Sequence, residues 1–89
     1  MNILIVEDDE KVAEFVSEGF RREGYAVTIA RDGEEGLTAA INGDYAAAVM
    51  DIMLPKLDGL EVIRRIRAAG RHLPVIVLSA RGSVEAKIK

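Results

Sequence analysis

Residues 3–9 read ILIVEDD, an aliphatic run that ends abruptly in acid. Four aliphatic residues are too few for a helix, and their lack of alternation predicts a strand covered on both faces, which is typical of a parallel sheet. Short apolar runs at 46–50 and 75–78 have the same character. The small residues of 46–50 favour a helix by propensity, but the position of this run between Gly43 and Pro55 favours a strand.

The segments between these runs carry apolar residues at three- and four-residue spacing, which predicts amphipathic helices. The first helix is expected to begin at Asp9 as its N-cap and to end at Gly24. Its predicted apolar face consists of Val12, Phe15, Val16, Gly19 and Phe20. Residues 25–30 read as a strand, and residues 33–42 and 60–69 as two more helices. Ser83 can cap a last helix that has hardly begun at Lys89.

This order, βαβαβαβ with the start of a helix, predicts an α/β fold with a doubly wound parallel sheet and right-handed crossovers. The expectation is four strands, three full helices and the start of a fourth. With 89 residues the chain forms one domain at most. The aliphatic run at 75–78 would then form an open sheet edge, available for pairing with a second chain.

The composition excludes several classes of protein. A net charge of −3 argues against nucleic acid as the partner of this segment. Without cysteine there is neither a disulfide framework nor a thiolate metal site. The apolar N-terminus lacks a basic leader, and no run approaches the length needed to span a bilayer. We therefore expect a soluble, cytoplasmic chain.

Acidic and hydroxyl side chains follow the predicted strands at the point where each strand ends. Glu7 and Asp8 follow the first strand, Asp51 the third and Ser79 the fourth. Because parallel strands end at one edge of the sheet, these side chains should converge there. Converging carboxylates repel unless a cation compensates, and an all-oxygen set suits Mg²⁺ better than zinc. With the cation bound, Asp51 could attack phosphorus as a nucleophile, and Ser79 could donate a hydrogen bond to a phosphoryl oxygen.

The stretches ILIVEDD at 3–9, MDIMLP at 50–55, DG at 58–59 and VLSAR at 77–81 together resemble the receiver domain of two-component response regulators. Within that family they are most similar to the winged-helix transcription-factor branch. The spacing agrees, since Asp51 lies 43 residues after Asp8 and 28 before Ser79. The resemblance runs along essentially all of residues 1–89 and implies a flavodoxin-like fold.

The resemblance assigns a role to each matching residue. Asp51 corresponds to the acceptor of a phosphoryl group from a histidine kinase, and Ser79 to the residue that turns toward the phosphate and switches an output face. Glu7, Asp8, Asp51 and the backbone carbonyl of Met53 correspond to the Mg²⁺ site. The implied function is a phospho-acceptor rather than an enzyme, with catalysis limited to its own phosphorylation and dephosphorylation, in a longer regulator of transcription.

The chain departs from the family pattern after residue 79. The expected fifth strand, the fifth helix, the lysine at the end of that strand and a DNA-binding effector domain are missing, so residues 1–89 read as a partial receiver. Lys87 and Lys89 follow the fourth strand too closely to be that lysine. Two other functions stay open: a magnesium-dependent phosphohydrolase with Asp51 as nucleophile, and a non-phosphorylated interaction fragment that forms a homodimer or exchanges segments through the incomplete sheet. The hydrolase interpretation is weakened by Met53, which stands where such enzymes commonly carry a second Asp.

Overall fold

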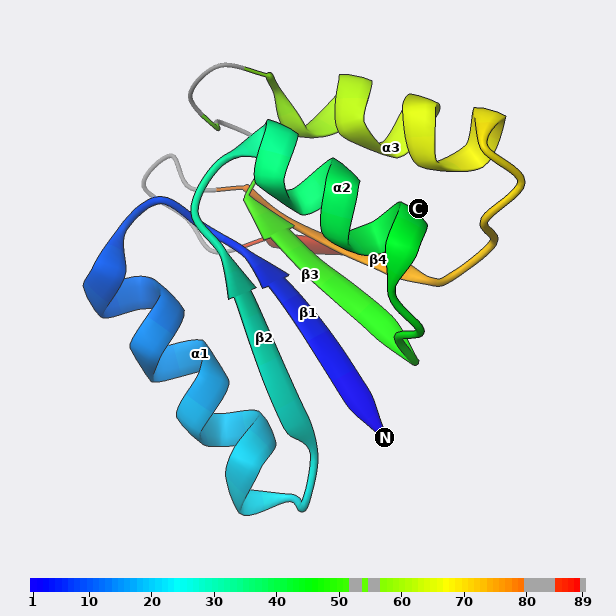
Figure 1. Cartoon of the computed structure of the whole chain (residues 1–89). Helices are drawn as coiled ribbons and strands as arrows, with labels where there is room; N and C mark the ends of the chain where they lie inside the picture. Colours follow the sequence, from blue (N-terminus) through cyan, green and yellow to red (C-terminus); the bar gives the residue numbers. More distant parts are fainter. Residues whose placement is uncertain (52–53, 55–56, 80–84, 89) are drawn as a thin grey trace.

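A computed structural model describes residues 1–51, 54, 57–79 and 85–88 of the chain, with the backbone alone at 79 and 85–88. The elements run in the order β1 (Asn2–Val6), α1 (Glu10–Arg22), β2 (Ala26–Ala30), α2 (Gly33–Asn42), β3 (Ala47–Asp51), α3 (Gly59–Ala68), β4 (Val75–Ser79) and β5 (Glu85–Ile88) (Figure 1). The predicted parallel α/β order is confirmed for the first four strands and the three helices. None of the described helices is long and apolar enough to cross a bilayer.

The sheet has the strand order β2-β1-β3-β4-β5, and β1 to β4 are parallel. The chain winds from β1 outward to β2 and then crosses back to β3 on the other side of β1. The order therefore reverses between β1 and β3. In a doubly wound sheet this reversal leaves a crevice at the carboxyl ends of the two strands, which is where ligands bind.

Each helix begins where an aspartate caps it. The carboxylate of Asp9 accepts hydrogen bonds from the backbone N–H groups of Lys11 and Val12, and Asp32 and Asp58 cap α2 and α3 in the same way. These bonds satisfy N–H groups that the helix itself leaves without a partner. The prediction that Asp9 is the N-cap of this helix is confirmed.

Two apolar layers flank the sheet. Side chains of α2 and α3, including Ala40, Val62 and Ile66, pack with Leu4 and Met50 on one face. On the opposite face Val16 and Phe20 of α1 pack over Ile3, Ile5 and Val49. Leu4 and Ile5 are both fully buried although they point to opposite faces. This explains why residues 3–6 are aliphatic without alternation.

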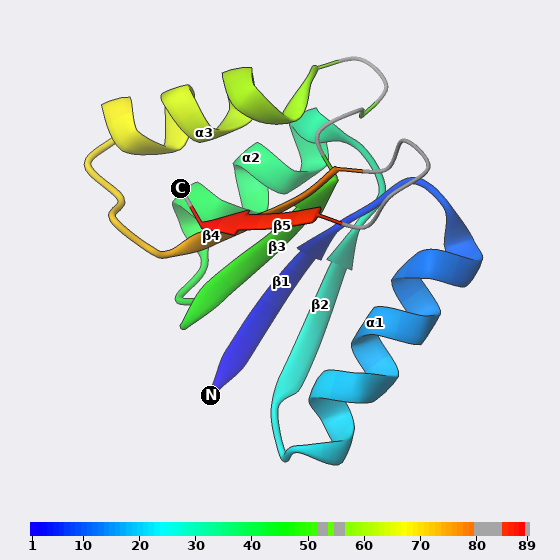
Figure 2. The ribbon, with the colours of Figure 1, turned by 180° about the vertical axis from the view of Figure 1, so that it is seen from behind.

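The prediction of a helix start near the end of the chain is wrong. Residues 85–88 form β5, which pairs antiparallel with β4 and places Ser79 beside Glu85 and Ile76 beside Ile88 (Figure 2). Backbone pairing gives this segment hydrogen bonds that a single helical turn could not supply, because helix nucleation is costly. The predicted open edge at β4 is therefore also wrong, and Lys87 lies in a strand. Ser83 and Lys89 lie outside the described residues.

The predicted apolar face of α1 is only partly correct. The residues of α1 buried against the sheet are Ala13 and Ser17, with Val16 and Phe20 half-buried beside them. Phe15 is 80% exposed and Val12 is 39% exposed. Small side chains at 13 and 17 let the helix approach β1 and β2 closely, and the helix is thereby rotated so that Phe15 points away from the sheet.

Candidate functional site

Two strand ends and one turn bring three carboxylates together. Asp51 is the last residue of β3, which is hydrogen-bonded to β1 on one side and β4 on the other. Glu7 follows β1 directly, and its backbone N–H donates to the carbonyl of Ala30 at 2.9 Å, which continues the β1–β2 ladder by one residue. Asp8 lies in the turn that leads to α1.

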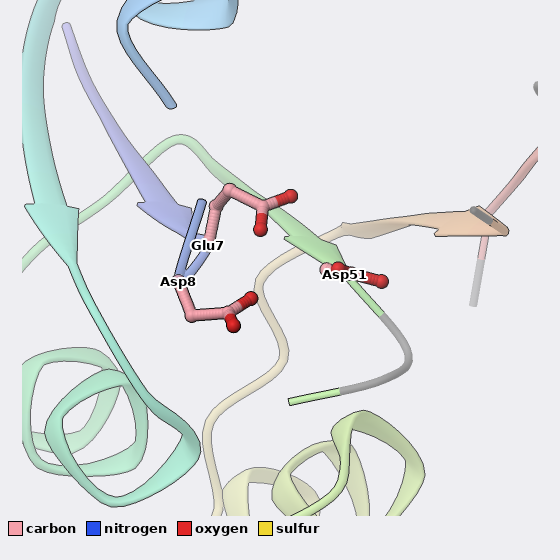
Figure 3. Close-up of side chains that lie close together, drawn as sticks. All are labelled: Glu7, Asp8 and Asp51. Carbon is pink, nitrogen blue, oxygen red and sulfur yellow. The ribbon is translucent and has the colours of Figure 1, made fainter. Parts of the chain in front are cut away.

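The three carboxylates face one another. One oxygen from each of Glu7, Asp8 and Asp51 lies within 4.8 Å of the other two (Figure 3). Glu7 and Asp51 are buried, with 6% and 7% of their surfaces exposed, whereas Asp8 is exposed. The prediction that these carboxylates converge is confirmed in geometry. This arrangement concentrates up to three negative charges at the mouth of the crevice.

The protein compensates these charges only in part. The backbone N–H of Asp9 donates a hydrogen bond of 2.9 Å to Glu7 Oε2. Burial nevertheless raises the pKa of Glu7 from 4.5 to about 7, against the lowering effect of that N–H. The smaller causes of this raised pKa are a hydrogen bond with Asp8 and the negative charges of Asp51 and Asp8. Without a cation, the cluster therefore holds a proton near neutral pH.

An apolar wall stands behind the carboxylates, and it was not anticipated from the sequence. Val12 and Val16 of α1, Val49 of β3 and Leu78 of β4 line a small crevice together with Glu7 and Asp51. These side chains keep water from the inner side of the two acids, which is the physical cause of the raised pKa of Glu7. The alternation of side chains along β3 and β4 could have predicted this wall, since Val49, Asp51 and Leu78 lie on the same face of the sheet.

Of two further predicted site residues, the structure describes only the backbone of Ser79 and nothing of Met53. Ser79 ends β4, one residue beyond the level at which Leu78 pairs with Asp51, so its backbone lies at the same sheet edge as the carboxylates. The orientation of its hydroxyl is outside what the structure describes. Met53, predicted to offer its backbone carbonyl, also lies outside the described residues.

The donor set fits a hard divalent cation. Three carboxylate oxygens at this spacing can share one ion, and oxygen ligands suit Mg²⁺ or Ca²⁺. Mg²⁺ usually keeps several waters and takes only one or two carboxylates directly. The exposed Asp8 leaves the outer side of the cluster open to such waters.

Residues 3–89 match the family described as "Response regulator receiver domain". The chain belongs to this family. The "uncharacterized transcriptional regulatory protein YkoG" of Bacillus subtilis (strain 168) is 49% identical over 87 residues, which cover 98% of this chain and 38% of that protein. This chain thus spans about two fifths of the length of such curated relatives.

Solved receiver domains have the same fold. The receiver domain of the Francisella response regulator 1452 superposes with a TM-score of 0.85 at 36% identity, covering 92% of this chain and 68% of that one. The receiver domain of the sensor histidine kinase PA1611 from Pseudomonas aeruginosa PAO1 gives 0.84 at 39% identity, covering 90% and 67%. That structure has a magnesium ion coordinated in its active-site cleft. The predicted flavodoxin-like receiver fold is confirmed.

The raised pKa of Glu7 predicts how the stability of the metal-free protein depends on pH. Between pH 4.5 and about 7 the folded state binds more protons than the unfolded state, so stability should fall as pH rises through this window. With allowance for solvent screening at the open side of the cluster, the free energy of unfolding should fall by about 2 kcal/mol. The measurement is urea unfolding without divalent cations. Glu7→Gln should remove most of this slope.

Glu61 provides an internal check on that measurement. Hydrogen bonds with Arg64, the larger cause, and with Arg65 lower the pKa of Glu61 to about 2. The contribution of Glu61 to folding stability is therefore complete above pH 4.5 and is lost only as the pH falls below that value. Its titration therefore lies outside the window of Glu7. A stability that rises between pH 4.5 and 7 would contradict the assignment to Glu7.

Proposed function

We propose that this receiver domain accepts a phosphoryl group from a histidine kinase on Asp51, with Mg²⁺ held by Glu7, Asp8, Asp51 and the backbone carbonyl of Met53. The observation that carries the proposal is the convergence of the three carboxylates at the switch point of the sheet. The magnesium ion in the cleft of the related PA1611 receiver supports the choice of cation.

Asp51 suits the role of nucleophile because of its position. It ends a central strand that is fixed on both sides, so its carboxylate is held at the edge of the sheet. In the proposed reaction a carboxylate oxygen of Asp51 forms a bond to phosphorus, and the bond between phosphorus and the donor breaks, with its electron pair leaving on the donor. Bound Mg²⁺ would supply positive charge that offsets the negative charges of Asp51 and of the phosphoryl oxygens.

Glu7, Asp8 and Ser79 would position the ion and the phosphoryl group, and Ser79 would also respond to phosphorylation. Glu7 would hold its place through the N–H of Asp9 and contribute to the ion through water, and Asp8 would reach it directly. Ser79, at the end of the neighbouring strand, would donate a hydrogen bond to a phosphoryl oxygen and so couple phosphorylation to the adjoining surface. In the longer protein, as its transcriptional relatives suggest, this surface would control an effector domain.

The test is incubation with a small phosphodonor and Mg²⁺, followed by intact mass measurement. Wild type should gain one phosphoryl group that is lost in acid or base, and Asp51→Ala should gain none. Asp58→Asn is the matched control, because it removes one exposed carboxylate yet keeps a side chain that can cap α3.

Two outcomes would reject the proposal, namely an adduct that is stable to acid or one that survives Asp51→Ala. Steady release of phosphate from many donor molecules per protein would instead favour the phosphohydrolase. Transfer from a purified histidine kinase that also depends on Asp51 would establish the partner class.

A further inference from the structure

A small cavity lies at the end of the sheet opposite the carboxylate cluster. It is formed where α2 ends and β3 begins, beside the connection from α3 to β4 (Figure 1), and its volume is about 160 Å³. A cavity of this size can hold a molecule such as benzene, so it has room for a ligand of about six non-hydrogen atoms. Ala40 and Leu73 form an apolar part of its wall, and the exposed Asp44 and His72 lie at its mouth.

The aromatic ring of Tyr45 forms one side of this cavity, and Gly43 makes room for the ring. The φ of Gly43 is −106°, so its backbone conformation does not require glycine. A Cβ built on Gly43 would lie 2.5 Å from Cε2 of Tyr45 and 3.0 Å from the carbonyl oxygen of Ala39. The absence of a side chain at residue 43 therefore lets the ring stay where it lines the cavity. The Tyr45 hydroxyl makes no hydrogen bond with the described residues.

Arg71 brings a fixed positive charge to the cavity. Its Nε and Nη2 donate hydrogen bonds of 3.1 and 2.7 Å to the carbonyl of Ile41 in the last turn of α2. Its backbone N–H donates to the carbonyl of Ile66, and its own carbonyl accepts from Nη1 of Arg67. Helix capping explains the bonds to Ile41, but Nη1 of Arg71 makes no hydrogen bond with the described residues. A guanidinium held in this way can bind a carboxylate with little further loss of conformational entropy.

Asp44 brings the opposite charge to the same cavity. Its carboxylate makes no ion pair or hydrogen bond with the described residues, Arg71 included. An acid and a base therefore line one small cavity without neutralising each other, and the space between them is wide enough for a ligand. A molecule that carries both a carboxylate and an ammonium group would pair with both side chains. A phosphate dianion fits less well, because Asp44 would repel it.

We propose that this cavity binds a small zwitterion, namely an α-amino acid with a short side chain or a close analogue of one. The carboxylate of the ligand accepts hydrogen bonds from Arg71 inside the cavity and from His72 at its mouth. The ammonium group of the ligand lies toward Asp44, and the short side chain packs against Ala40 and Leu73.

The bound ligand would join the end of α2 to the connection between α3 and β4. The hydrogen bonds from Arg71 to Ile41 already link these two segments, which are 30 residues apart in sequence. Asp51 and Ser79 lie at the other ends of β3 and β4, so the ligand would not compete with Mg²⁺ or with a phosphoryl group. Since only the folded chain forms the cavity, occupancy would stabilise the domain independently of phosphorylation.

The test is titration with glycine, L-alanine and L-serine in turn, followed by NMR of the backbone amides. The amides of residues 43–45 and 71–73 should shift and saturate, with a dissociation constant on the order of 1 mM for L-alanine. Acetate and methylamine each carry only one of the two charges and should bind at least about tenfold more weakly. L-Phenylalanine exceeds the volume of the cavity and should cause no saturable shift.

Two variants separate the charges of the ligand. Asp44→Asn should weaken binding of L-alanine by about fivefold without weakening that of acetate, because acetate has no ammonium group. Glu14→Gln is the matched control, since it also removes an exposed, unpaired carboxylate but lies on α1, across the sheet from the cavity. Arg71→Lys should weaken both probes by about tenfold, because an ammonium group cannot replace the guanidinium fork. Its folding is checked by circular dichroism, since it also loses the bonds to Ile41.

Lack of a saturable shift with all three amino acids would overturn the proposal. Acetate that binds as tightly as L-alanine would reject a zwitterion as the ligand, and equal effects of Asp44→Asn and Glu14→Gln would reject Asp44 as its partner. If Arg71→Lys does not fold, the comparison of these two variants decides alone, because Asp44 makes no bond that the fold needs. Asp51→Ala should bind L-alanine as wild type does, so this test and that of the proposed function fail separately.

Discussion

Asp51→Asn should weaken Mg²⁺ binding by at least about tenfold and, in the absence of metal, make the folded protein more stable. The two effects have one cause. Three carboxylate oxygens lie within 4.8 Å of one another, and at about pH 8 Glu7, whose pKa is about 7, has lost the proton that it holds near neutral pH. Removing one charge removes two repulsive pairs, for an expected gain of about 1–3 kcal/mol in the free energy of unfolding. The same substitution removes one of the proposed ligands of the ion.

The measurement is urea unfolding at about pH 8 with and without Mg²⁺. Wild type should be stabilised by the ion through mass action, and Asp51→Asn should be nearly insensitive to it. Asp58→Asn changes the net charge equally and keeps a capping residue, so it should retain the wild-type response to Mg²⁺. If Asp51→Asn were less stable than wild type without metal, the hydrogen bonds and packing of Asp51 would outweigh the repulsion among the carboxylates.

Gly33→Ala should destabilise the fold by about 3 kcal/mol, a large fraction of the stability of a small domain. A Cβ at Gly33 would lie 2.0 Å from the backbone carbonyl oxygen of Leu57 and 2.9 Å from its carbonyl carbon. The obstacle is backbone, which cannot rotate away as a side chain can. The first turn of α2 and the segment before α3 would have to separate.

Gly19→Ala is the matched control, because a Cβ there meets nothing. It should stabilise the fold by up to about 1 kcal/mol through helix propensity alone. Both variants are compared with wild type by thermal unfolding. Equal effects of the two substitutions would show that the contact between Gly33 and Leu57 does not restrict the fold.

Much of the site could be predicted from the sequence because strand ends are marked locally. The aliphatic run before Glu7 and the run before Asp51 each specify a buried parallel strand, and parallel strands must end together. Helix capping also depends on neighbouring residues alone, which is why Asp9 could be predicted as an N-cap while Glu7 and Asp8 were predicted as site residues. The apolar wall and the raised pKa of Glu7 could not be predicted, since they depend on which side of α1 meets the sheet.

By itself, the sequence determined the order of β1 to β4 and of the three helices, the convergence of Glu7, Asp8 and Asp51, and the family. These follow from periodicity and from short-range chemistry, which every segment carries with it. The tertiary structure alone decided that residues 85–88 pair with β4, since a short segment with weak preferences adopts the conformation that satisfies its backbone hydrogen bonds. It also decided that Phe15 faces away from the sheet, because Ala13 and Ser17 allow the closest approach of α1 to β1 and β2. A pattern of apolar residues defines a stripe, but only packing decides which part of that stripe is buried.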